Sequence, residues 1–447
     1  MGYRAYPEYK DSGVEWLGQV PTEWEVRRLK FSSCLINEKV DAQDSSLEYL
    51  GLEHIESWTG NRIADHTSLS EGIASKFSPN DVLFGKLRPY LAKVWQADIH
   101  GVATTEALVI RPNNGVVSSF LKYYMLSRDF IDVVNGSTYG SKMPRANWDF
   151  IGNLSLLIPH IEEQRQIVLF LDHKTAQIDR LIEKKQELIE KLQEQRIATI
   201  TQSVTKGLAS DIAIKASNNQ WFDSLPSHWQ VIRLKDLVVD AIAGPYGSSL
   251  TKSMYTNSGY RVYGQQQVIP EDFAIGDYYI SDEKYEEMQR YRARPGDILI
   301  SVMGTIGRAA LVPDDAEPGI INPRLVLYRA NERIVRPEYL KSFINSRPSQ
   351  SYFSLVAQGT TMEGINMALI GELAVTAPPL NEQDEILLAQ QTRTVRLEKQ
   401  AESVTNAIAH LHEYRTALIT AAVTGQIDVR DWQTPEPTKE PVDKEVA

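Results

Sequence analysis

The pattern of hydrophobic and polar positions predicts two unusually long helices. Residues 160–206 and residues 380–424 contain neither proline nor glycine, and each run follows a proline and precedes a glycine. Proline before a run and glycine after it are helix start and stop signals. An unbroken helix of roughly 45 residues is about 68 Å long, far beyond an ordinary globular helix. Such helices need a partner, and we expect these two to pair with each other.

Apolar residues recur at steps of three and four along both runs, which predicts a coiled-coil seam. The seam positions are Ile178, Ile182, Ile189 and Leu192 in the first run, and Leu397, Val404, Ile408, Leu411 and Leu418 in the second. Arg196 and Arg415 interrupt the seam at equivalent positions. Two interpretations stay open: each arginine makes a contact or ion pair that sets register, or a local kink turns it outward.

The remainder of the chain reads as two α+β domains of similar fold, separated by the two long antiparallel helices and related by a pseudo-two-fold internal repeat. The predicted parts are residues 1–158, 159–210, 211–378 and 379–430, followed by a tail, 431–447. Three prolines among charged residues predict that the tail is disordered. The alternative arrangement is that both helices break, near Asp172 or Gln390, and fold back as short bundles.

An internal duplication supports this division. The first copy of the opening motif reads Trp16-Leu17-x-x-Val20-Pro21-x-x-Trp24-x-Val26-x-Arg28-Leu29-Lys30, and the second reads Trp221-Phe222-x-x-Leu225-Pro226-x-x-Trp229-x-Val231-x-Arg233-Leu234-Lys235. Before each long helix, Pro159-x-x-x-Glu163-Gln164 matches Pro378-x-x-x-Glu382-Gln383. Asn147 to Leu154 likewise matches Asn366 to Leu373. The centres of the two halves diverge. Shared ends and different centres suggest one frame with two different readers, although drift after an old duplication would leave the same pattern.

Composition narrows the class of protein. At 447 residues, with 42% hydrophobic and 23% charged residues, the chain is an ordinary globular one that needs more than one core. It has no apolar run long enough to span a membrane and no signal-peptide core, so we expect a soluble cytoplasmic protein. Its single cysteine, Cys34, excludes an internal disulfide and a cysteine-based metal cluster. The net charge of −11 argues against nucleic acid unless a basic face or basic partners compensate.

The sequence lacks the usual catalytic motifs. We find no phosphate-binding loop ending in Lys-Ser/Thr, no Gly-x-Gly-x-x-Gly, no Gly-x-Ser-x-Gly and no His-Glu-x-x-His. Methyltransferases that act on DNA amino groups carry an Asn/Asp-Pro-Pro-aromatic loop. The two most similar segments, at 321–324 and 377–380, do not match it. Two globular domains without a catalytic constellation favour binding over catalysis, and we expect no metal site.

The ordered set of motifs resembles the specificity subunit of type I restriction–modification systems. The resemblance rests on Tyr9 to Gly18 with the motif that follows it, on Pro378-Pro379-Leu380-x-Glu382-Gln383 leading into a long helix, and on Asp297-Ile298-Leu299-Ile300 with Gly304-Thr305-Ile306-Gly307. Gly359-Thr360-Thr361 with Gly364-Ile365-Asn366 adds to it. No single motif is highly specific, but the ordered set occurs twice and covers residues 8–430.

The resemblance implies a non-catalytic, DNA-binding subunit of a bacterial or archaeal cytoplasmic complex. Each target-recognition domain would read one half of a bipartite, asymmetric sequence of double-stranded DNA. The helices would dock two methylation subunits, and restriction subunits would join them. S-adenosylmethionine, ATP and magnesium would belong to these partners. The alternatives are a duplicated coiled-coil scaffold without DNA specificity and, less well supported, a self-sufficient methyltransferase or nuclease.

The geometry of DNA suggests that the coiled coil acts as a ruler between half-sites. Four inserted residues, about 6 Å of helix, would lengthen the unread spacer by about two base pairs at roughly 3.4 Å each.

Candidate DNA-contacting residues come from side-chain chemistry, because arginine, lysine, asparagine and glutamine read major-groove edges. In the first domain they are Lys86, Arg88, Tyr90, Tyr139, Ser141, Lys142 and Arg145. In the second domain they are Tyr246, Ser248, Ser249, Lys252, Gln265, Gln266, Gln267, Arg292, Arg294, Thr360 and Thr361. For any single one of them, a solvated surface role is the simpler interpretation. The three glutamines stand out in a predicted strand–loop junction, where alternation would turn the middle one away. Arg88, before Pro89, is expected to be extended.

Overall fold

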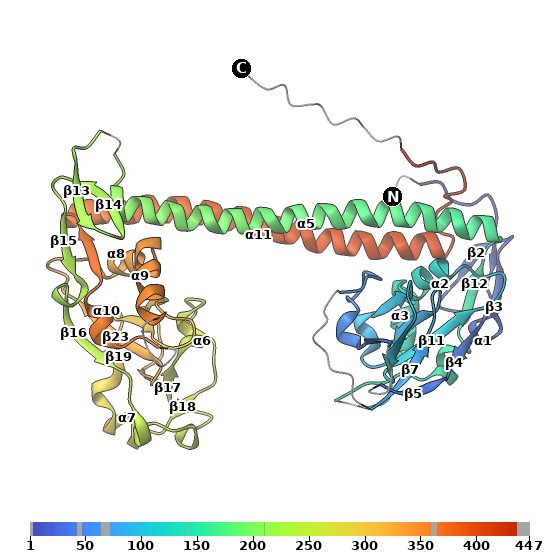
Figure 1. The fold of residues 1–447 in the computed structure, drawn as a ribbon, viewed down its shortest axis with the longest axis horizontal. Helices are drawn as coiled ribbons and strands as arrows, with labels where there is room; N and C mark the ends of the chain where they lie inside the picture. The colour runs from blue at the N-terminus through green and yellow to red at the C-terminus, as the bar shows by residue number, and fades with distance from the viewer. Residues whose placement is uncertain are drawn as a thin grey trace. The chain divides into compact units, whose positions relative to one another are not determined.

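The computed structural model describes residues 3–42, 47–63, 72–140, 142–209, 211–358 and 364–435. It divides into two compact units, Met1–Gln186 with Thr405–Ala447, and Glu187–Val404. Each unit therefore contains one globular part and half of each long helix. The long helices are α5, Ile161–Lys206, and α11, Leu380–Val423 (Figure 1). They lie within the predicted helical regions. Each begins shortly after the predicted proline and ends shortly before the predicted glycine.

Both long helices are uninterrupted, as expected, so the alternative of a break near Asp172 or Gln390 is wrong. In the first unit, Ile178 of α5 and Leu418 of α11 belong to the same buried cluster. In the second unit, the Gln390 amide donates to Ser203 Oγ at 2.7 Å. The N-terminal half of each helix thus packs against the C-terminal half of the other, which makes the pair antiparallel. None of the helices in the described part of the chain is both long and apolar enough to cross a membrane.

The seam residues form the inward faces of the two helices. Ile178, Leu397 and Leu418 are buried, whereas the positions nearer the middle of the helices are half-buried. The half-buried set comprises Ile182, Ile189, Leu192, Val404, Ile408 and Leu411. Two helices alone shield only one stripe of each other, so their central seam keeps partial exposure.

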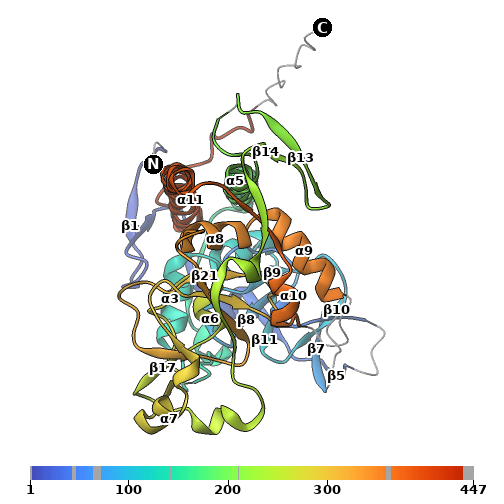
Figure 2. The ribbon, with the colours of Figure 1, turned by 90° about the vertical axis from the view of Figure 1, so that its left-hand side faces the viewer.

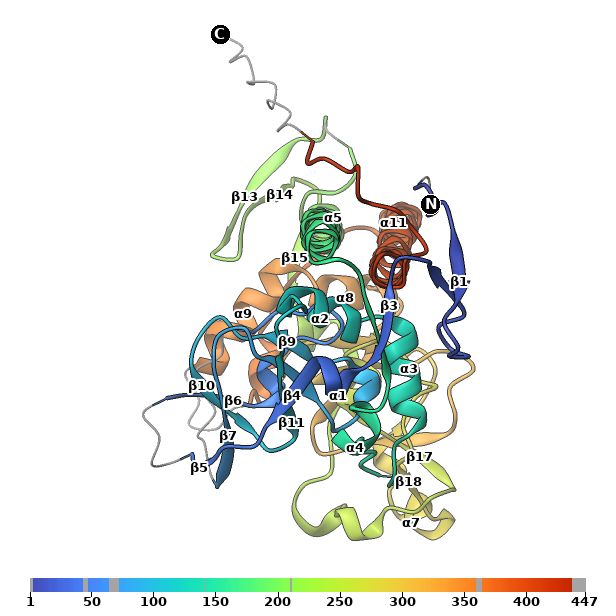
Figure 3. The same ribbon diagram turned by 90° about the vertical axis from the view of Figure 1, so that its right-hand side faces the viewer.

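The globular part of the first unit is a strand-rich core with short helices (Figure 3). Its strands are β1 (Tyr9–Asp11), β2 (Gln19–Pro21), β3 (Glu25–Arg28), β4 (Ser33–Ile36), β5 (Lys39–Asp41), β6 (Glu48–Leu50), β7 (Ile73–Phe77), β8 (Val82–Gly85), β9 (Val94–Gln96), β10 (Gly101–Thr104), β11 (Ala107–Pro112) and β12 (Ser155–Ile158). Its short helices are α1 (Leu29–Ser32), α2 (Ser118–Met125), α3 (Arg128–Gly136) and α4 (Trp148–Ile151).

The globular part of the second unit has the same kinds of element in nearly the same order (Figure 2). Its strands are β13 (Ile214–Asn219), β14 (Phe222–Pro226), β15 (Gln230–Arg233), β16 (Val238–Ala243), β17 (Tyr260–Tyr263), β18 (Tyr279–Ile280), β19 (Arg292–Ala293), β20 (Ile298–Ser301), β21 (Ala309–Leu311), β22 (Gly319–Ile321), β23 (Leu325–Ala330) and β24 (Ala374–Ala377). Its helices are α6 (Gln265–Val268), α7 (Asp282–Glu287), α8 (Pro337–Ile344), α9 (Arg347–Gln358) and α10 (Met367–Gly371).

Sheet topology confirms the internal repeat in the divergent centres of the halves. One four-stranded sheet has the order β4-β11-β8-β9 in the first unit and β16-β23-β20-β21 in the second. In a second sheet, β10 pairs parallel with β6 and antiparallel with β7, just as β22 pairs parallel with β17 and antiparallel with β19. The four strands of the first sheet and three strands of the second therefore have equivalent partners in the two halves. The fourth strand of the second sheet differs, because β5 pairs with β7 whereas β18 pairs with β17.

Two buried aspartates make ion pairs at matching places in this frame. Asp81, at the start of β8, binds Arg111 of β11 at 2.6 Å, and Asp297, before β20, binds Arg329 of β23 at 2.9 Å. Asn147 and Asn366 each cap a short helix, α4 or α10, by accepting from a backbone N–H three residues on. An asparagine cap satisfies one of the unpaired donors at a helix start. The repeated sequence positions are thus mostly structural.

The glutamate of each Pro-x-x-x-Glu-Gln motif ties a long helix to a tryptophan. Glu163 accepts from the Trp24 indole N–H at 3.1 Å, and Glu382 accepts from that of Trp229 at 3.0 Å. Both tryptophans are almost completely buried. Gly425, which follows α11, lies against Trp24, and Gly207, which follows α5, lies against Trp229. Each tryptophan therefore joins the beginning of one long helix to the end of the other.

The glutamine of the same motif joins its helix to the globular part. The Gln164 amide accepts from Val117 N–H at 2.8 Å and donates to the carbonyls of Gly115 and Pro159. Gln383 makes the equivalent three bonds with Arg336 N–H and the carbonyls of Ile334 and Pro378. Both side chains are fully buried. These amides therefore fix the angle at which each domain leaves its helix.

We predict that Gln164→Leu and Gln383→Leu each destabilise their own unit by about 2–3 kcal/mol, because each leaves buried backbone groups without a partner. Urea unfolding followed by tryptophan fluorescence measures the change. Gln186→Leu, at an exposed position of α5, is the matched control and is expected to have little effect. Equal midpoints for Gln164→Leu and the control would show that the motif does not hold the junction.

Candidate nucleic-acid interface

In the first domain, three loops meet where β8 and β10 end and β11 begins. Lys86 N–H donates to the Glu106 carbonyl at 2.9 Å, and Arg88 N–H donates to the Pro144 carbonyl at 2.8 Å. Leu87 and Arg145 form an isolated antiparallel bridge, as do Tyr139 and Arg145. These contacts bring together the loop segments that carry six predicted residues. They are Lys86, Arg88, Tyr90, Tyr139, Lys142 and Arg145.

The charge of this face is mixed but locally basic. Arg145 is paired with Glu106 at 3.0 Å, so its guanidinium is already engaged. Lys39, on β5, was not among the predicted residues, yet it belongs to the same region. Lys39 pairs with Ser75 of β7, which in turn pairs with Ala103 of β10, so Lys39 lies beside the end of β10. Burial lowers the pKa of Lys39, and the positive charge of Lys86 lowers it further.

Arg88 does not adopt the extended backbone expected before a proline. Its φ is 52°, in the left-handed region, and it caps the short 3-10 helix Pro89–Leu91. The expectation was wrong because the loop reverses direction within a few residues of β8, and the bond from Arg88 N–H to Pro144 fixes that reversal. The Arg88 side chain and the Tyr90 ring are both exposed.

In the second domain, the equivalent end of the sheet forms a groove of about 390 Å³. It lies where β17 and β22 end and β23 begins. The polar and aromatic side chains that line it are Lys252, Tyr255, Gln265, Gln266, Tyr278 and Arg324. Lys252, Gln265 and Gln266 are predicted residues that the structure brings together. Tyr246, Ser248 and Ser249 are exposed on the segment just before the groove, which Gly244 N–H anchors to the Leu325 carbonyl at 2.9 Å.

The three consecutive glutamines do not lie at a strand–loop junction with strand alternation. They form the one-turn helix α6, so the middle residue, Gln266, is exposed and Gln267 is fully buried. Gln267 accepts from Gly264 N–H and donates to the Ile275 carbonyl, both at 2.9 Å. Both of its amide atoms are occupied, so Gln267 is a structural cap and not a DNA contact. The prediction for this residue is therefore corrected.

Arg292 and Arg294 are not among the residues that line the groove. Arg292 pairs with Ile320 in β22, and its guanidinium binds Glu286 at 2.7 Å and lies over the ring of Tyr285. Arg294 N–H donates to the Asp297 carboxylate, at the start of β20. β20 runs from that point toward the groove, so Arg294 lies at the far end of β20. Arg292 lies on the edge strand β19, and its guanidinium is already engaged there. Ser141, Thr360 and Thr361 lie outside the described residues.

Arg324, Tyr255 and Tyr278 were missed from the sequence. Arg324 lies in the segment 321–324, which was considered only as a possible catalytic loop. The rings of Tyr255 and Tyr278 are 5.0 Å apart. Burial raises the pKa of Tyr255, Tyr278 adds to the rise, and the positive charge of Arg324 opposes it. Arg324 therefore lies close to this aromatic pair. The only signal in the sequence was that this segment precedes the β-rich run Leu325-Val326-Leu327.

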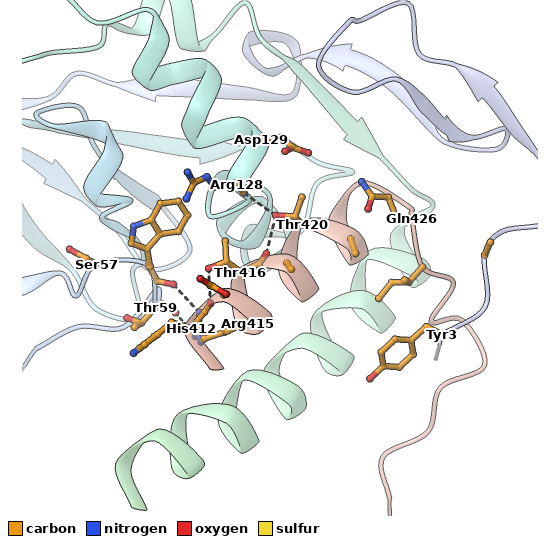
Figure 4. Close-up of a pocket in the computed structure, with 16 residues that line it drawn as sticks. Tyr3, Ser57, Thr59, Arg128, Asp129, His412, Arg415, Thr416, Thr420 and Gln426 are labelled. Atoms are coloured by element: carbon orange, nitrogen blue, oxygen red, sulfur yellow. Dashed lines mark hydrogen bonds between the residues drawn. The ribbon is translucent and has the colours of Figure 1, made fainter. Parts of the chain in front are cut away.

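A larger cavity, about 1060 Å³, lies in the first unit beside α11 and away from these loops (Figure 4). Its main feature is Arg415, which is only 3% exposed. Arg415 binds Asp179 of α5 at 2.8 Å and donates to the carbonyls of Trp58 and Thr59 at 2.9 Å. Of the two interpretations for this arginine, the ion pair is therefore correct, and there is no kink. The cavity wall is structural.

Arg196, the equivalent arginine, also pairs across the helices, with Glu398 at 3.3 Å. That pair is partly exposed, and Arg196 is not buried as Arg415 is. The part of the chain that the structure describes contains no group of three or more histidine, cysteine or acidic side chains that could hold a metal ion.

Comparisons with known proteins give one consistent result. A family model described as the type I restriction modification DNA specificity domain matches residues 77–191 and 226–404. The chain is 22% identical over 442 residues to the MjaVIII type I restriction enzyme specificity subunit of Methanocaldococcus jannaschii, covering 92% of this chain and 95% of that one. It is 25% identical over 192 residues to the EcoDI specificity subunit of Escherichia coli, covering 42% of each.

One solved structure has a closely similar fold. Its title describes complex assembly and conformational transition of the type I R-M system. The likeness has a TM-score of 0.67 at 20% identity and covers 90% of this chain and 98% of that one. The fold found here is thus a known one.

We predict that Arg415→Ala lowers the stability of the first unit by about 2–3 kcal/mol, because the Asp179 carboxylate and two backbone carbonyls lose their donor. Arg415→Lys keeps the charge but not the planar fork, so its stability is expected to lie between those of the wild type and Arg415→Ala. Arg180→Ala, at an exposed neighbouring position of α5, is the control. Urea unfolding midpoints measure all three, and identical midpoints for Arg415→Ala and Arg180→Ala would contradict the assignment.

Proposed function

Because this chain belongs to the family of type I restriction–modification DNA specificity subunits, we propose that each of its globular domains reads one half of a bipartite, asymmetric DNA target. As a specificity subunit, it is the DNA-recognition component of its complex and is not itself the catalyst. The observation that carries the proposal is the repeat. The two halves share a frame of equivalent sheets and ion pairs, while the loops at one sheet end carry different polar side chains.

The reading surfaces are the loop clusters at this end of each domain. In the first domain the surface comprises Lys39, Lys86, Arg88, Tyr90, Tyr139, Lys142 and Arg145. In the second it comprises Tyr246, Ser248, Ser249, Lys252, Tyr255, Gln265, Gln266, Tyr278 and Arg324. Guanidinium, ammonium and amide groups suit base edges and phosphates. Ser141, Thr360 and Thr361 remain predictions from the sequence.

An acidic chain can specify DNA when partner subunits supply part of the phosphate contact. Phosphate contacts give affinity and fix position, whereas base contacts give specificity. The net charge of −11 therefore fits a subunit that contributes base contacts within a larger clamp. We place two methylation subunits on the paired helices, with restriction subunits joining that core in the cytoplasm. S-adenosylmethionine, ATP and magnesium belong to those partners.

The alternative of a protein scaffold without DNA specificity is not favoured, because a DNA specificity domain model matches both halves of the chain. The direct test of the proposal is methylation mapping. The chain is co-expressed with its methylation subunits in a host without other systems, and modified adenines are located across the genome. A single bipartite motif with a fixed gap supports the proposal. A stable complex that modifies no such motif would overturn it.

In this proposal the paired helices set the length of the unread DNA spacer between the two half-sites. Because α5 and α11 both continue through the two units, their length sets the distance between the reading surfaces. One added heptad preserves the seam and adds about 10.5 Å of helix. That length corresponds to about three base pairs of B-DNA.

We therefore predict that inserting one heptad into both helices, after Gln186 and after Val404, lengthens the unread spacer by about three base pairs and leaves both half-sites unchanged. Methylation mapping of the insertion variant measures this. The same seven residues inserted after Thr434, beyond the helices, are the control and are expected to leave the spacer as it was. An unchanged spacer in a folded, active helix variant would rule out the ruler.

A further inference from the structure

The internal repeat allows the two reading surfaces to be compared position by position. Lys86 N–H donates to the Glu106 carbonyl, and Val302 N–H donates to the Arg324 carbonyl at 3.0 Å. Each donor directly follows the strand that pairs with β11 or with β23. Glu106 and Arg324 therefore occupy the same place on the loop that leads into that strand. One domain has a carboxylate there and the other has a guanidinium.

The neighbouring loop shows the opposite exchange. Leu87 bridges to Arg145, and Met303 bridges to Gly364, so the next residues, Arg88 and Gly304, are equivalent. Both adopt left-handed backbones, with φ of 52° and 64°. Glycine adopts this conformation freely, but an arginine does so at a cost of about 1–2 kcal/mol. A strained non-glycine residue that persists where its counterpart is glycine points to a use for its side chain.

Two hydrogen bonds fix the backbone of Arg88. Its N–H donates to the Pro144 carbonyl at 2.8 Å, and its own carbonyl accepts from Leu91 N–H at 2.9 Å. The side chain is exposed, and its guanidinium makes no ion pair or side-chain hydrogen bond with any residue that the structure describes. The nearby Arg145, by contrast, is engaged by Glu106.

Arg324 has the same freedom in the second domain. It is exposed, and its bonds to described residues are made by its backbone: its N–H donates to Asn322 Oδ1 at 2.9 Å and its carbonyl accepts from Val302 N–H at 3.0 Å, while its guanidinium makes no ion pair or side-chain hydrogen bond among them. It lines the groove with Gln265, Gln266 and the Tyr255–Tyr278 pair. Glu106, its counterpart, is neutralised by Arg145. Each reading surface thus presents a guanidinium free of carboxylates, but on different loops.

We propose that Arg88 and Arg324 are guanine-reading residues, each specifying one G·C pair in its own half-site. A guanidinium donates two parallel hydrogen bonds to guanine O6 and N7, the commonest specific arginine contact in the major groove. A free guanidinium suits this contact because its planar fork is pre-organised, so that little side-chain entropy is lost for each hydrogen bond formed. The reciprocal loop positions explain how one frame reads two different half-sites. The inference rests on the proposed function and names the residues that carry it.

The test is methylation mapping of Arg88→Gly and Arg324→Ala in complexes with the methylation subunits. Arg88→Gly copies the glycine of the second domain, so it removes the guanidinium while relieving the backbone. Each variant is expected to relax one G·C position in one half-site, reducing a preference of roughly 5- to 150-fold toward none. The two variants must affect different half-sites, with the other half-site and the spacer unchanged. Arg333→Ala, exposed at the far end of β23, is the control and should leave the whole motif intact.

The outcomes separate the inference from the function beneath it. If the wild-type complex modifies no bipartite motif, the proposed function fails. If the wild type modifies such a motif and either variant leaves it unchanged, the assignment of that arginine fails. A variant could instead weaken methylation equally at all sequences and lower the slope of log affinity against log salt concentration by about one. That result would show a phosphate contact and would also overturn the assignment. Thermal melting and co-purification with the methylation subunits confirm that each variant is folded.

Discussion

The junction between each globular domain and its long helix is the interaction on which the rest of the structure depends. At the first turn of α5 and of α11, a glutamate holds a buried tryptophan indole, and the next residue, a glutamine, closes three backbone hydrogen bonds. Both side chains of the motif face the domain, because the helix starts there and has unpaired donors and acceptors nearby. A reader on a flexible joint could not keep a fixed distance from a second reader. A junction held by these bonds is what the proposed ruler requires.

The junction also explains why the sequence repeats where it does. Matching residues belong to the frame: the tryptophans, the Glu-Gln pairs and the asparagine caps at Asn147 and Asn366. The ion pairs of the buried Asp81 and Asp297 with Arg111 and Arg329 belong to it as well. Loop residues at the sheet end do not match. A frame that is fixed by buried, directional contacts leaves its exposed loops free to change chemistry at little cost in stability.

Much of this fold can be read from the sequence, and the failures have physical causes. Helix ends at proline and glycine, the seam period and the duplication are local or repetitive signals, so they were predicted. The α6 turn was missed because a one-turn helix has no period to detect, and Gln267 was taken for a surface residue although Gly264 and Ile275 occupy its amide.

The roles of three arginines could not be predicted from the sequence, because they depend on tertiary contacts. Arg292 is a basic residue in the sequence, but it lies on the edge strand β19, where Glu286 and Tyr285 engage its guanidinium. Arg324 was passed over because its neighbours were compared with a catalytic loop, and only the bond from Val302 to its carbonyl reveals its equivalence to Glu106. Arg415 could be assigned only when its partners Asp179, Trp58 and Thr59 were seen together.

The central claim, that equivalent sheet ends of the two domains face different half-sites, is tested most directly by site-specific photo-cross-linking. A photoreactive benzoylphenylalanine replaces Tyr90 or Tyr278, both exposed on the reading surfaces, in the complex bound to duplex labelled in either half-site. Phe31, exposed beyond the opposite end of β11, is the control position. The account predicts that the Tyr90 and Tyr278 positions each cross-link to one half-site, and to different ones, while the Phe31 position does not cross-link. Cross-linking of both positions to the same half-site, or of the control alone, would contradict it.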